Sequence, residues 1–335
     1  MIKSREDGKS IEKIFNACLI GCGKIAGNPL IEDGDLSSTH MQAINKSNIN
    51  VDFIVDIDEK QLLKFSKQYL IKNSSSALKE FHQHEIDLFI VCSPDNTHFE
   101  LLEEILLNSS PKLIFCEKPV CKTQEELDRL IQLSNEKNIP ILVNYNRRFL
   151  SNMIELKQII RSMTLGKLEF GRGVYYSGIR HNSSHMLDLI DFLFDKDYEI
   201  FDIKNGKFSP YKNDPSYDFS LRFPFTDHGE IEITSFDERN YQVFELCLYF
   251  QNAKVSLENF CTSVKIEYPL KNHIDELELS KTHYLNFVKP SFDEAYFKIS
   301  NYLSKPHENK KLIEEYLIDK KVFLYKIFSL FNKGK

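Results

Sequence analysis

Short apolar runs alternate with longer amphipathic stretches along the first 146 residues. The apolar runs are rich in Ile, Val, Leu and Phe, which is typical of parallel strands covered on both faces. They lie at residues 15–21, 51–56, 86–94, 112–119 and 140–146. The amphipathic stretches predict helices, among them residues 59–70, 97–107 and 123–138. This alternation predicts an α/β fold with a doubly wound parallel sheet, which binds ligands beyond the carboxyl ends of its strands.

The pattern changes after Phe149, where half-buried strands replace the fully apolar ones. Helices are predicted at residues 151–163 and 185–194. Alternating apolar and polar positions predict strands at residues 168–178, 217–223, 229–236, 242–250, 253–260 and 263–270. Such strands form an open, mostly antiparallel sheet with one solvated face. Helical sequence from Phe292 to Phe331, interrupted near Pro306, closes the chain. We therefore expect two domains, residues 1–146 and an α+β domain of residues 147–335.

Three small residues follow the first apolar run, Gly21, Gly23 and Ala26 in CLIGCGKIAG. In the pattern G-x-G-x-x-G/A, the first glycine makes a tight turn and the second lets a pyrophosphate approach the backbone. The third position is small so that helix and strand pack closely. The N–H groups of this turn, which includes Lys24 and Ile25, would then hold the phosphates of a dinucleotide. An ordinary glycine-rich turn is the alternative.

Asp56 ends the second apolar run. A carboxylate there accepts hydrogen bonds from both ribose hydroxyls and repels a 2′-phosphate, so it favours NAD over NADP. The interval from the glycines exceeds the usual value of about 20 residues. We assign the excess to a polar loop inserted at Asn28–Ser38, before a helix that continues at residues 39–43. A solvated acid at a strand end is the alternative for Asp56.

Polar turns also follow the third and fourth apolar runs. They contain Ser93, Pro94, Asn96 and His98 in CSPDNTH, and Glu117 and Lys118 in CEKPV. A partly desolvated lysine at the ligand-binding edge can donate a hydrogen bond or a proton to a substrate oxygen. Plain β-to-α turns and a solvated lysine are the alternatives, but the position of Lys118 at that edge favours a function.

A third polar segment, HNSSHMLDL, spans residues 181–189. His185 and Asp188 are three residues apart and would be neighbours on one face of a helix. A carboxylate so placed fixes the tautomer of an imidazole, or both groups approach one substrate. A helix N-terminus capped by Ser183 or Ser184 is the alternative.

The composition narrows the function classes. A formal net charge of −6 and the lack of a basic run argue against nucleic acid and against a polybasic membrane anchor. The N-terminus is too polar for a secretion signal, and no apolar run approaches the roughly 20 residues that span a bilayer. Seven scattered cysteines without C-x-x-C spacing predict reduced thiols, a cytoplasmic location and no metal site.

Taken in order, these segments resemble the Gfo/Idh/MocA oxidoreductases, the glucose–fructose oxidoreductase and inositol dehydrogenase family. The matching segments are GCGKIA, H-x-x-A at residues 40–43, VDFIVDID, CSPDNTH, CEKPV, NYNRRF and SHMLDL, over nearly the whole chain. The resemblance implies an N-terminal Rossmann domain and a C-terminal α+β domain whose open sheet forms a homodimer or homotetramer. It also implies NAD-dependent hydride transfer to or from a sugar, nucleotide sugar or polyol. The inserted loop resembles members found with surface-polysaccharide biosynthesis.

The resemblance also implies roles for single residues. Lys118 matches a lysine that contacts the substrate oxygen and the nicotinamide ribose, and His185 matches an acid/base or substrate-orienting histidine. Cofactor contacts are expected from Gly21, Gly23, Lys24, Ile25, Ala26, Asp56, Ser93, Pro94, Asn96, His98, Glu117 and Lys118. Substrate contacts are expected from Lys118, Asn146, Arg147, Tyr176, His181, His185 and Asp188. Further candidates are Tyr145, Phe149 and Tyr175 for stacking on a sugar, and Arg147 or Arg148 for a phosphate, with one arginine pairing across the domain junction.

One position departs from the family pattern. Four residues before His185, where inositol dehydrogenase-like members have aspartate, this chain has His181, and Ser183 replaces a glycine. Neutral His181 brings no negative charge to stabilise an imidazolium at His185. Either Lys118 and His185 share the proton transfer, or His181 substitutes for the aspartate. Two other functions stay open, a non-catalytic regulator with the same fold and an enzyme that uses NAD transiently for oxidation and elimination.

Overall fold

The computed structural model describes residues 13–27, 37–195, 197–223, 229–272, 274, 276–285, 291–321 and 323–333. The chain divides into two compact units. The first unit is Met1–Asn144 with Ser291–Lys320, and the second is Tyr145–Pro290 with Lys321–Lys335. The first break lies two residues before the expected boundary. The expectation that residues 147–335 form one domain is wrong for Ser291–Lys320, which returns to the first unit.

The first unit contains a parallel sheet, as predicted, and this sheet has six strands. Their order is β3 (Asn73–Ser75), β2 (Ile49–Val55), β1 (Phe15–Ile20), β4 (Leu88–Val91), β5 (Leu113–Cys116) and β6 (Ile141–Val143). All residues of β4, β5 and β6 are buried, which explains their continuous apolar sequence. Helices α2 (Glu59–Tyr69), α3 (His98–Asn108) and α4 (Gln124–Lys137) lie close to their predicted bounds. The short strand β3 was not predicted.

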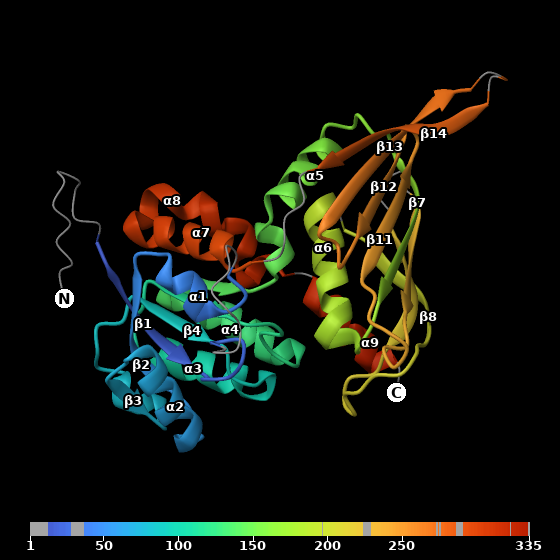
Figure 1. Ribbon diagram of the computed structural model, residues 1–335. Coiled ribbons are helices and arrows are strands. Elements are labelled where there is room, and N and C mark those ends of the chain that lie inside the picture. Colours follow the sequence, from blue (N-terminus) through green and yellow to red (C-terminus); the bar gives the residue numbers. More distant parts are fainter. Residues whose placement is uncertain are drawn as a thin grey trace, which may run out of the picture. The chain divides into compact units, whose positions relative to one another are not determined.

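The returning segment forms α7 (Asp293–Ser304), α8 (Pro306–Ile313) and two 3₁₀ turns, Glu314–Tyr316 and Ile318–Lys320. Figure 1 shows α7 and α8 on the face of the sheet opposite to α3 and α4. The side chain of Asp293 accepts a hydrogen bond from the amide of Ser37 (3.1 Å), and Leu317 forms a bridge with Leu142 of β6. The segment therefore completes the first unit through contacts distant in sequence. None of the described helices is long and apolar enough to cross a membrane.

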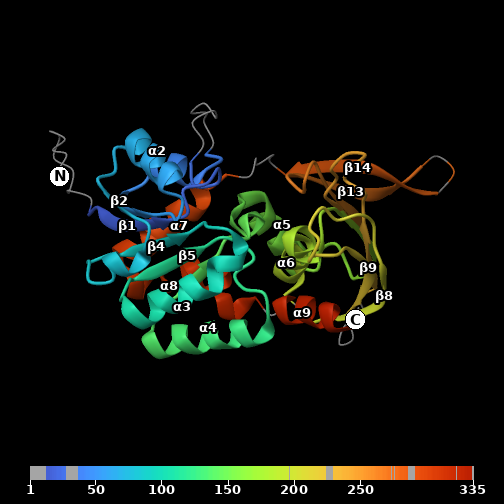
Figure 2. The same cartoon turned by 90° about the horizontal axis from the view of Figure 1, so that it is seen from below.

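The second unit contains an open sheet of eight strands, which confirms the expected α+β domain. The order is β14 (Leu277–Leu285), β13 (Ser263–Lys271), β12 (Ala253–Glu258), β11 (Glu245–Phe250), β7 (Leu168–Tyr175), β10 (Glu230–Ser235), β9 (Tyr217–Arg222) and β8 (Glu199–Asn205). Among the described strand pairs of this second sheet, β7–β10 is parallel and the others are antiparallel. Helices α5 (Ser151–Arg161), α6 (Ser184–Phe194) and α9 (Phe323–Lys333) lie on one face of this sheet (Figure 2). The two edge strands, β8 and β14, were not predicted.

Candidate functional site

The carboxyl ends of four neighbouring strands form one edge of the parallel sheet. Asp56 follows β2, Gly21 follows β1, Ser93 follows β4, and Glu117 and Lys118 follow β5. Strands lie about 4.8 Å apart, so this row spans about 14 Å. The direction in which the chain crosses the sheet reverses between β1 and β4, and sheets of this type bind ligands at such a point. The polar segments predicted from the sequence thus meet on one edge of one unit.

The glycine-rich turn begins a helix that an insertion interrupts. His40, the first residue of α1 (His40–Asn45), donates its N–H to the carbonyl of Ile25 at 3.0 Å. Met41 donates to the carbonyl of Ala26 at 2.9 Å. Helix α1 therefore continues the backbone hydrogen bonds of the turn, as expected for an insertion at Asn28–Ser38. Residues 28–36 of that loop lie outside the described residues.

Asp56 is held beside the glycine turn by backbone groups. Its Oδ2 accepts a hydrogen bond from the N–H of Cys22 (2.7 Å), and its Oδ1 accepts one from the N–H of Asp58 (2.9 Å). A carboxylate offers about four acceptor positions, so acceptor capacity remains for hydroxyl groups of a ligand. The turn thus orients the carboxylate without saturating it.

His98 connects the turn after β4 to the turn after β5. Its Nε2 lies 2.9 Å from the carbonyl oxygen of Ser93, and its Nδ1 lies 2.7 Å from that of Pro119. Carbonyl oxygens only accept, so the neutral ring donates to one of them and the imidazolium to both. The ring is buried, which contradicts the expected direct contact with a cofactor. His98 fixes the spacing of the two turns, while Pro94 and Asn96 remain exposed on the first.

Glu117 is anchored by a buried network that the sequence did not reveal. Its Oε1 accepts hydrogen bonds from Nε2 of His40 (3.2 Å) and from the amide of Asn144 (2.6 Å), and Nδ1 of His40 lies 2.8 Å from the hydroxyl of Tyr296. Burial raises the pKa of Glu117, but His40, Asn144 and the charge of Lys118 outweigh burial and lower it. Burial raises the pKa of Tyr296, so its hydroxyl stays protonated and donates to His40. The turn that carries half-buried Lys118 is therefore fixed in place.

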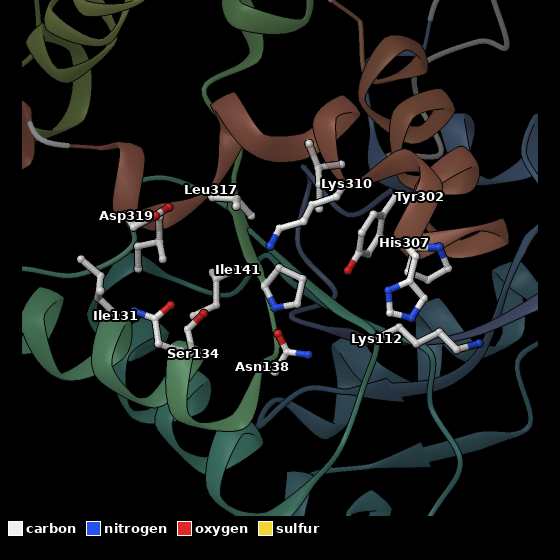
Figure 3. A pocket seen from close by; sticks show the side chains of 15 residues that line it. Lys112, Ile131, Ser134, Asn138, Ile141, Tyr302, His307, Lys310, Leu317 and Asp319 are labelled. Atoms are coloured by element: carbon white, nitrogen blue, oxygen red, sulfur yellow. The ribbon is translucent and has the colours of Figure 1, made fainter.

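A cavity of about 390 Å³ lies at the opposite edge of the same sheet (Figure 3). Lys112 and Pro140, which precede β5 and β6, line it together with the second half of α4 and with α7, α8 and the turns that follow. The side chains of His307 and Lys310 point into it (Figure 3). Since the strands begin rather than end there, this cavity is separate from the row of Asp56, Gly21, Ser93 and Lys118.

In the second unit, a π-helical turn at Ile179–Ser183 leads into α6 and carries His181. Nδ1 of His181 lies 2.7 Å from Oδ2 of buried Asp214, and the N–H of His181 donates to the same oxygen at 3.0 Å. The N–H of Arg180 donates to Oδ1 of Asp214 at 2.9 Å. The ring of Tyr211 stacks on that of His181, with 3.6 Å between the centroids. His181 therefore has a carboxylate partner, which the sequence analysis did not identify.

Three predicted substrate residues of the second unit keep accessible or unsatisfied polar groups. His185 lies in the first turn of α6 and is half-buried, with its ring edge-on to Tyr145 at 5.4 Å between centroids. Tyr176 follows β7 and is also half-buried. Oδ1 of Asn146 is buried with no hydrogen-bond partner among the described residues. Since buried polar atoms are normally hydrogen-bonded, this oxygen is a candidate acceptor for a ligand.

Asp188 is not available to a substrate, which corrects the prediction made from its spacing to His185. The residue is buried, and its Oδ1 accepts a hydrogen bond from Nε of Arg148 (2.8 Å) and lies 3.6 Å from Nζ of Lys321. Arg148 also binds Asp191 at 2.8 Å. Burial lowers the pKa of Arg148, but the two carboxylates outweigh burial and raise it. Arg148 thus pairs within its own unit, and not across the domain junction as we expected.

Arg147 and three aromatic residues are also buried, so the predictions that they contact substrate are wrong. Nε of Arg147 donates to the carbonyl of Phe260 at 3.1 Å, and burial lowers the pKa of its guanidinium. The hydroxyl of Tyr175 donates to a backbone carbonyl at 2.7 Å. Tyr145 and Phe149 are enclosed in the core. Their apolar surfaces serve packing in the second unit rather than stacking on a ligand.

The buried Lys321 predicts that stability increases with pH. Burial, with a contribution from Arg148, lowers the pKa of Lys321 from 10.5 to about 7. Between pH 7 and pH 10 the unfolded chain binds one more proton at this residue than the folded chain does, so the free energy of unfolding rises with pH. From pH 7 to pH 9 the gain is about 2–3 kcal/mol. Urea titrations of wild type and Lys321→Met would measure it, because the variant lacks this gain. Parallel pH dependences of the two proteins would contradict the expectation.

Comparison with known proteins gives a partial sequence match. Residues 15–145 match the Gfo/Idh/MocA family model, described as an oxidoreductase family with an NAD-binding Rossmann fold. Myo-inositol 2-dehydrogenase from Thermotoga maritima is 28% identical over 153 residues, which are 44% of this chain and 41% of that protein. The chain therefore matches less than half of the length of this curated relative.

Solved structures match over almost the whole chain. The WlbA dehydrogenase from Bordetella pertussis, in complex with NADH and UDP-GlcNAcA, has a TM-score of 0.71 at 14% identity, over 97% of each chain. The super-repressor mutant of Gal80p from Saccharomyces cerevisiae has a TM-score of 0.76 at 11% identity, over 95% of each chain. Identities this low show the fold alone. The match of residues 15–145 to the Gfo/Idh/MocA family model, over less than half of the chain, agrees with the resemblance predicted from the sequence.

Proposed function

We propose that this protein is an NAD(H)-dependent oxidoreductase that acts on a hydroxyl or keto carbon of a sugar, nucleotide sugar or polyol. One observation carries the proposal. Asp56, the glycine turn and Lys118 follow strands β2, β1 and β5 of one parallel sheet, in the order that suits a dinucleotide lying across a topological switch point. NAD, when bound there, supplies the hydride acceptor or donor.

The residues of this edge would contact different parts of the coenzyme and the substrate. The open backbone of Gly23 and the turn with Lys24 and Ile25 would face the pyrophosphate, and Asp56 would accept hydrogen bonds from the adenosine ribose. Lys118 would donate a hydrogen bond to the reacting oxygen. In the second unit, His185, Tyr176 and Asn146 would contact the substrate.

The named relatives support a sugar-like substrate. One is an inositol dehydrogenase, and one solved structure holds a nucleotide sugar beside NADH. A role in surface-polysaccharide biosynthesis belongs to the same proposal. The likeness to a repressor supports, as a second candidate, a regulator that binds NAD or sugar without turnover, since fold does not decide function.

The proposal includes a cytoplasmic location and assembly into a homo-oligomer. All seven cysteines are free thiols in the structure, and six are buried, which supports a cytoplasmic location. The open face of the second sheet exposes Tyr249 beside Phe170 and Arg172. Such a face supports a homodimer or homotetramer.

A ligand screen followed by product analysis tests the function. NAD(H) and NADP(H) are crossed with nucleotide sugars and free polyols, and the melting temperature is measured. We expect stabilisation by NAD(H) more than by NADP(H), and oxidised product by mass spectrometry for at least one sugar. NAD binding with no product from any substrate would support the regulator. A cleaved product without net NADH would support oxidation and elimination.

Substitution by alanine is expected to affect stability at one glycine of the turn and NAD binding at the other. Gly21 has a φ of +94°, and a Cβ there would lie 2.5 Å from the backbone N of Ser93, whereas a Cβ on Gly23 meets no heavy atom within 4 Å. Gly21→Ala should lower the melting temperature by several degrees. Gly23→Ala should keep the melting temperature but weaken NAD binding by about tenfold or more, because its methyl group occupies the approach of the pyrophosphate. Thermal unfolding and calorimetric titration measure both effects. Equal losses of stability in the two variants would contradict the proposed role of Gly23.

A further inference from the structure

We propose that the cavity at the amino-terminal edge of the parallel sheet is a second ligand-binding site, which takes a small phosphorylated compound with hydroxyl groups, such as a sugar phosphate. The cavity has a volume of about 390 Å³, and all of the described residues that line it belong to the first unit. This volume is within the range of about 300–1,000 Å³ that is usual for small-molecule sites. Apolar side chains, among them Pro140, Ile141 and Leu317, form part of its wall. Because the cavity lies at the opposite ends of the strands from Lys118, this inference does not rest on the proposed function.

Two basic side chains of α8 point into the cavity without a carboxylate partner. His307 and Lys310 are three residues apart, so they lie on one face of the helix (Figure 3). In the part of the chain that the structure describes, neither of them makes an ion pair. Glu308, on the same helix, binds Lys305 instead, at 2.9 Å. An anion in the cavity would accept hydrogen bonds from the ammonium group of Lys310 and from an imidazole N–H of His307.

A buried hydroxyl group in the same cavity also lacks a partner. Tyr302 of α7 is only 9% exposed, and its hydroxyl points into the cavity (Figure 3). This hydroxyl makes no hydrogen bond to any residue that the structure describes. Burial raises the pKa of Tyr302, so the hydroxyl stays protonated and can donate. Since buried polar groups are normally hydrogen-bonded, an acceptor on a ligand would satisfy this donor.

The first turn of α8 adds to the positive potential of the cavity. Pro306 and His307 of this turn line the cavity, and Lys305, which precedes it, makes no side-chain capping hydrogen bond. The amino-terminal end of a helix attracts phosphate through its N–H groups and its dipole. Lys112 contributes less, because Asp87 binds its ammonium group at 2.6 Å. Among the described lining residues none is an arginine, the side chain that best fits a planar carboxylate, so the donors suit a tetrahedral phosphate better.

Another part of the wall suits the hydroxyl groups of the ligand. Asp319 lines the cavity on the other side of Lys310 from His307 (Figure 3). Its carboxylate lies 3.5 Å from Nζ of Lys320, which compensates its charge. The side-chain amide of Asn138, at the end of α4, also lines the cavity and can both donate and accept. A compound with a phosphate at one end and hydroxyl groups at the other would therefore match both parts of the wall.

The test titrates the full chain with glucose 6-phosphate by calorimetry, with glucose and inorganic phosphate as separate probes. We expect a Kd below about 1 mM for glucose 6-phosphate, and affinities at least about tenfold weaker for each of the other two. Lys310→Ala should weaken the binding of glucose 6-phosphate by about tenfold or more, and Tyr302→Phe by about three- to tenfold, because each removes one donor to the phosphate. The matched control is Lys311→Ala, which removes an exposed lysine of the same helix that does not line the cavity and should bind as wild type.

A further variant distinguishes this cavity from the coenzyme edge. Lys118→Ala should leave the binding of glucose 6-phosphate unchanged. Binding that depends on Lys118 but not on Lys310 would overturn the second site, and so would the lack of binding at millimolar glucose 6-phosphate. Equal affinities for glucose 6-phosphate and inorganic phosphate would overturn the assignment to a phosphorylated compound. None of these titrations requires hydride transfer, so a failure of the proposed function would leave their outcome unchanged.

Discussion

Replacing Lys118 by alanine is expected to lower turnover by about 10²-fold or more while NAD affinity stays nearly unchanged. The ammonium group follows β5 at the carboxyl edge of the sheet, on a turn that His98 and the Glu117 network hold in place. A positioned donor stabilises the charge that develops on the reacting oxygen, so its loss affects kcat more than coenzyme binding. Steady-state kinetics, together with calorimetric titration of NAD, measure the two effects separately.

Two further lysine variants test whether turnover depends on the shape of the charged group at position 118 and on its place in the fold. Lys118→Arg keeps the positive charge but replaces a compact ammonium by a planar fork, so it should restore little of the lost turnover. Lys137→Ala removes an exposed lysine in the last turn of α4 and should leave kinetics unchanged. Turnover of Lys118→Ala within a few-fold of wild type would remove Lys118 from the mechanism.

Strands were predictable from the sequence where both of their faces are buried, or where one face is buried and the other is exposed. The fully buried strands β4, β5 and β6 have unbroken apolar sequences, and β10 alternates with period two. Strand β14 was missed because eight of its nine residues are exposed, so that no apolar alternation marks it. The return of α7 and α8 to the first unit depends on contacts such as that between Ser37 and Asp293, which no local pattern encodes.

In the candidate site, too, residues marked by a local pattern were predictable, and contacts between distant segments were not. Gly21, Asp56 and Lys118 were predictable because each directly follows a strand, and strand order then brings them to one edge. Partners from distant segments were not. Tyr296 reaches His40 across 256 residues, and Asp214 reaches His181 across 33. For Asp188, spacing gave the helical face correctly but could not tell that Arg148 buries its carboxylate.

Arg148→Met is expected to destabilise the second unit by about 3–5 kcal/mol. The guanidinium binds Asp188 and Asp191, each at 2.8 Å, and its side chain is 4% exposed. Without it, buried Asp188 and half-buried Asp191 face Lys321. Arg148 is one of the groups that lower the pKa of Lys321, so this lysine takes up a proton more readily in the variant, but one positive charge does not compensate two carboxylates. Burial already raises the pKa of Asp191 in the wild type. In the variant this carboxyl takes up a proton more readily, so lowering the pH from 7 to 5 should recover part of the lost stability.

The second unit contains its own control for this prediction. Arg161 and Asp195 form an ion pair of the same chemistry at 2.5 Å, but their side chains are 50% and 66% exposed. Water solvates both groups when the pair is broken, so Arg161→Met should cost less than about 1 kcal/mol. Urea unfolding of both variants, followed by circular dichroism, gives the comparison. Both substitutions remove an arginine from an ion pair with a carboxylate. Equal losses in the free energy of unfolding would therefore mean that burial does not determine how much the ion pairs of Arg148 contribute to stability.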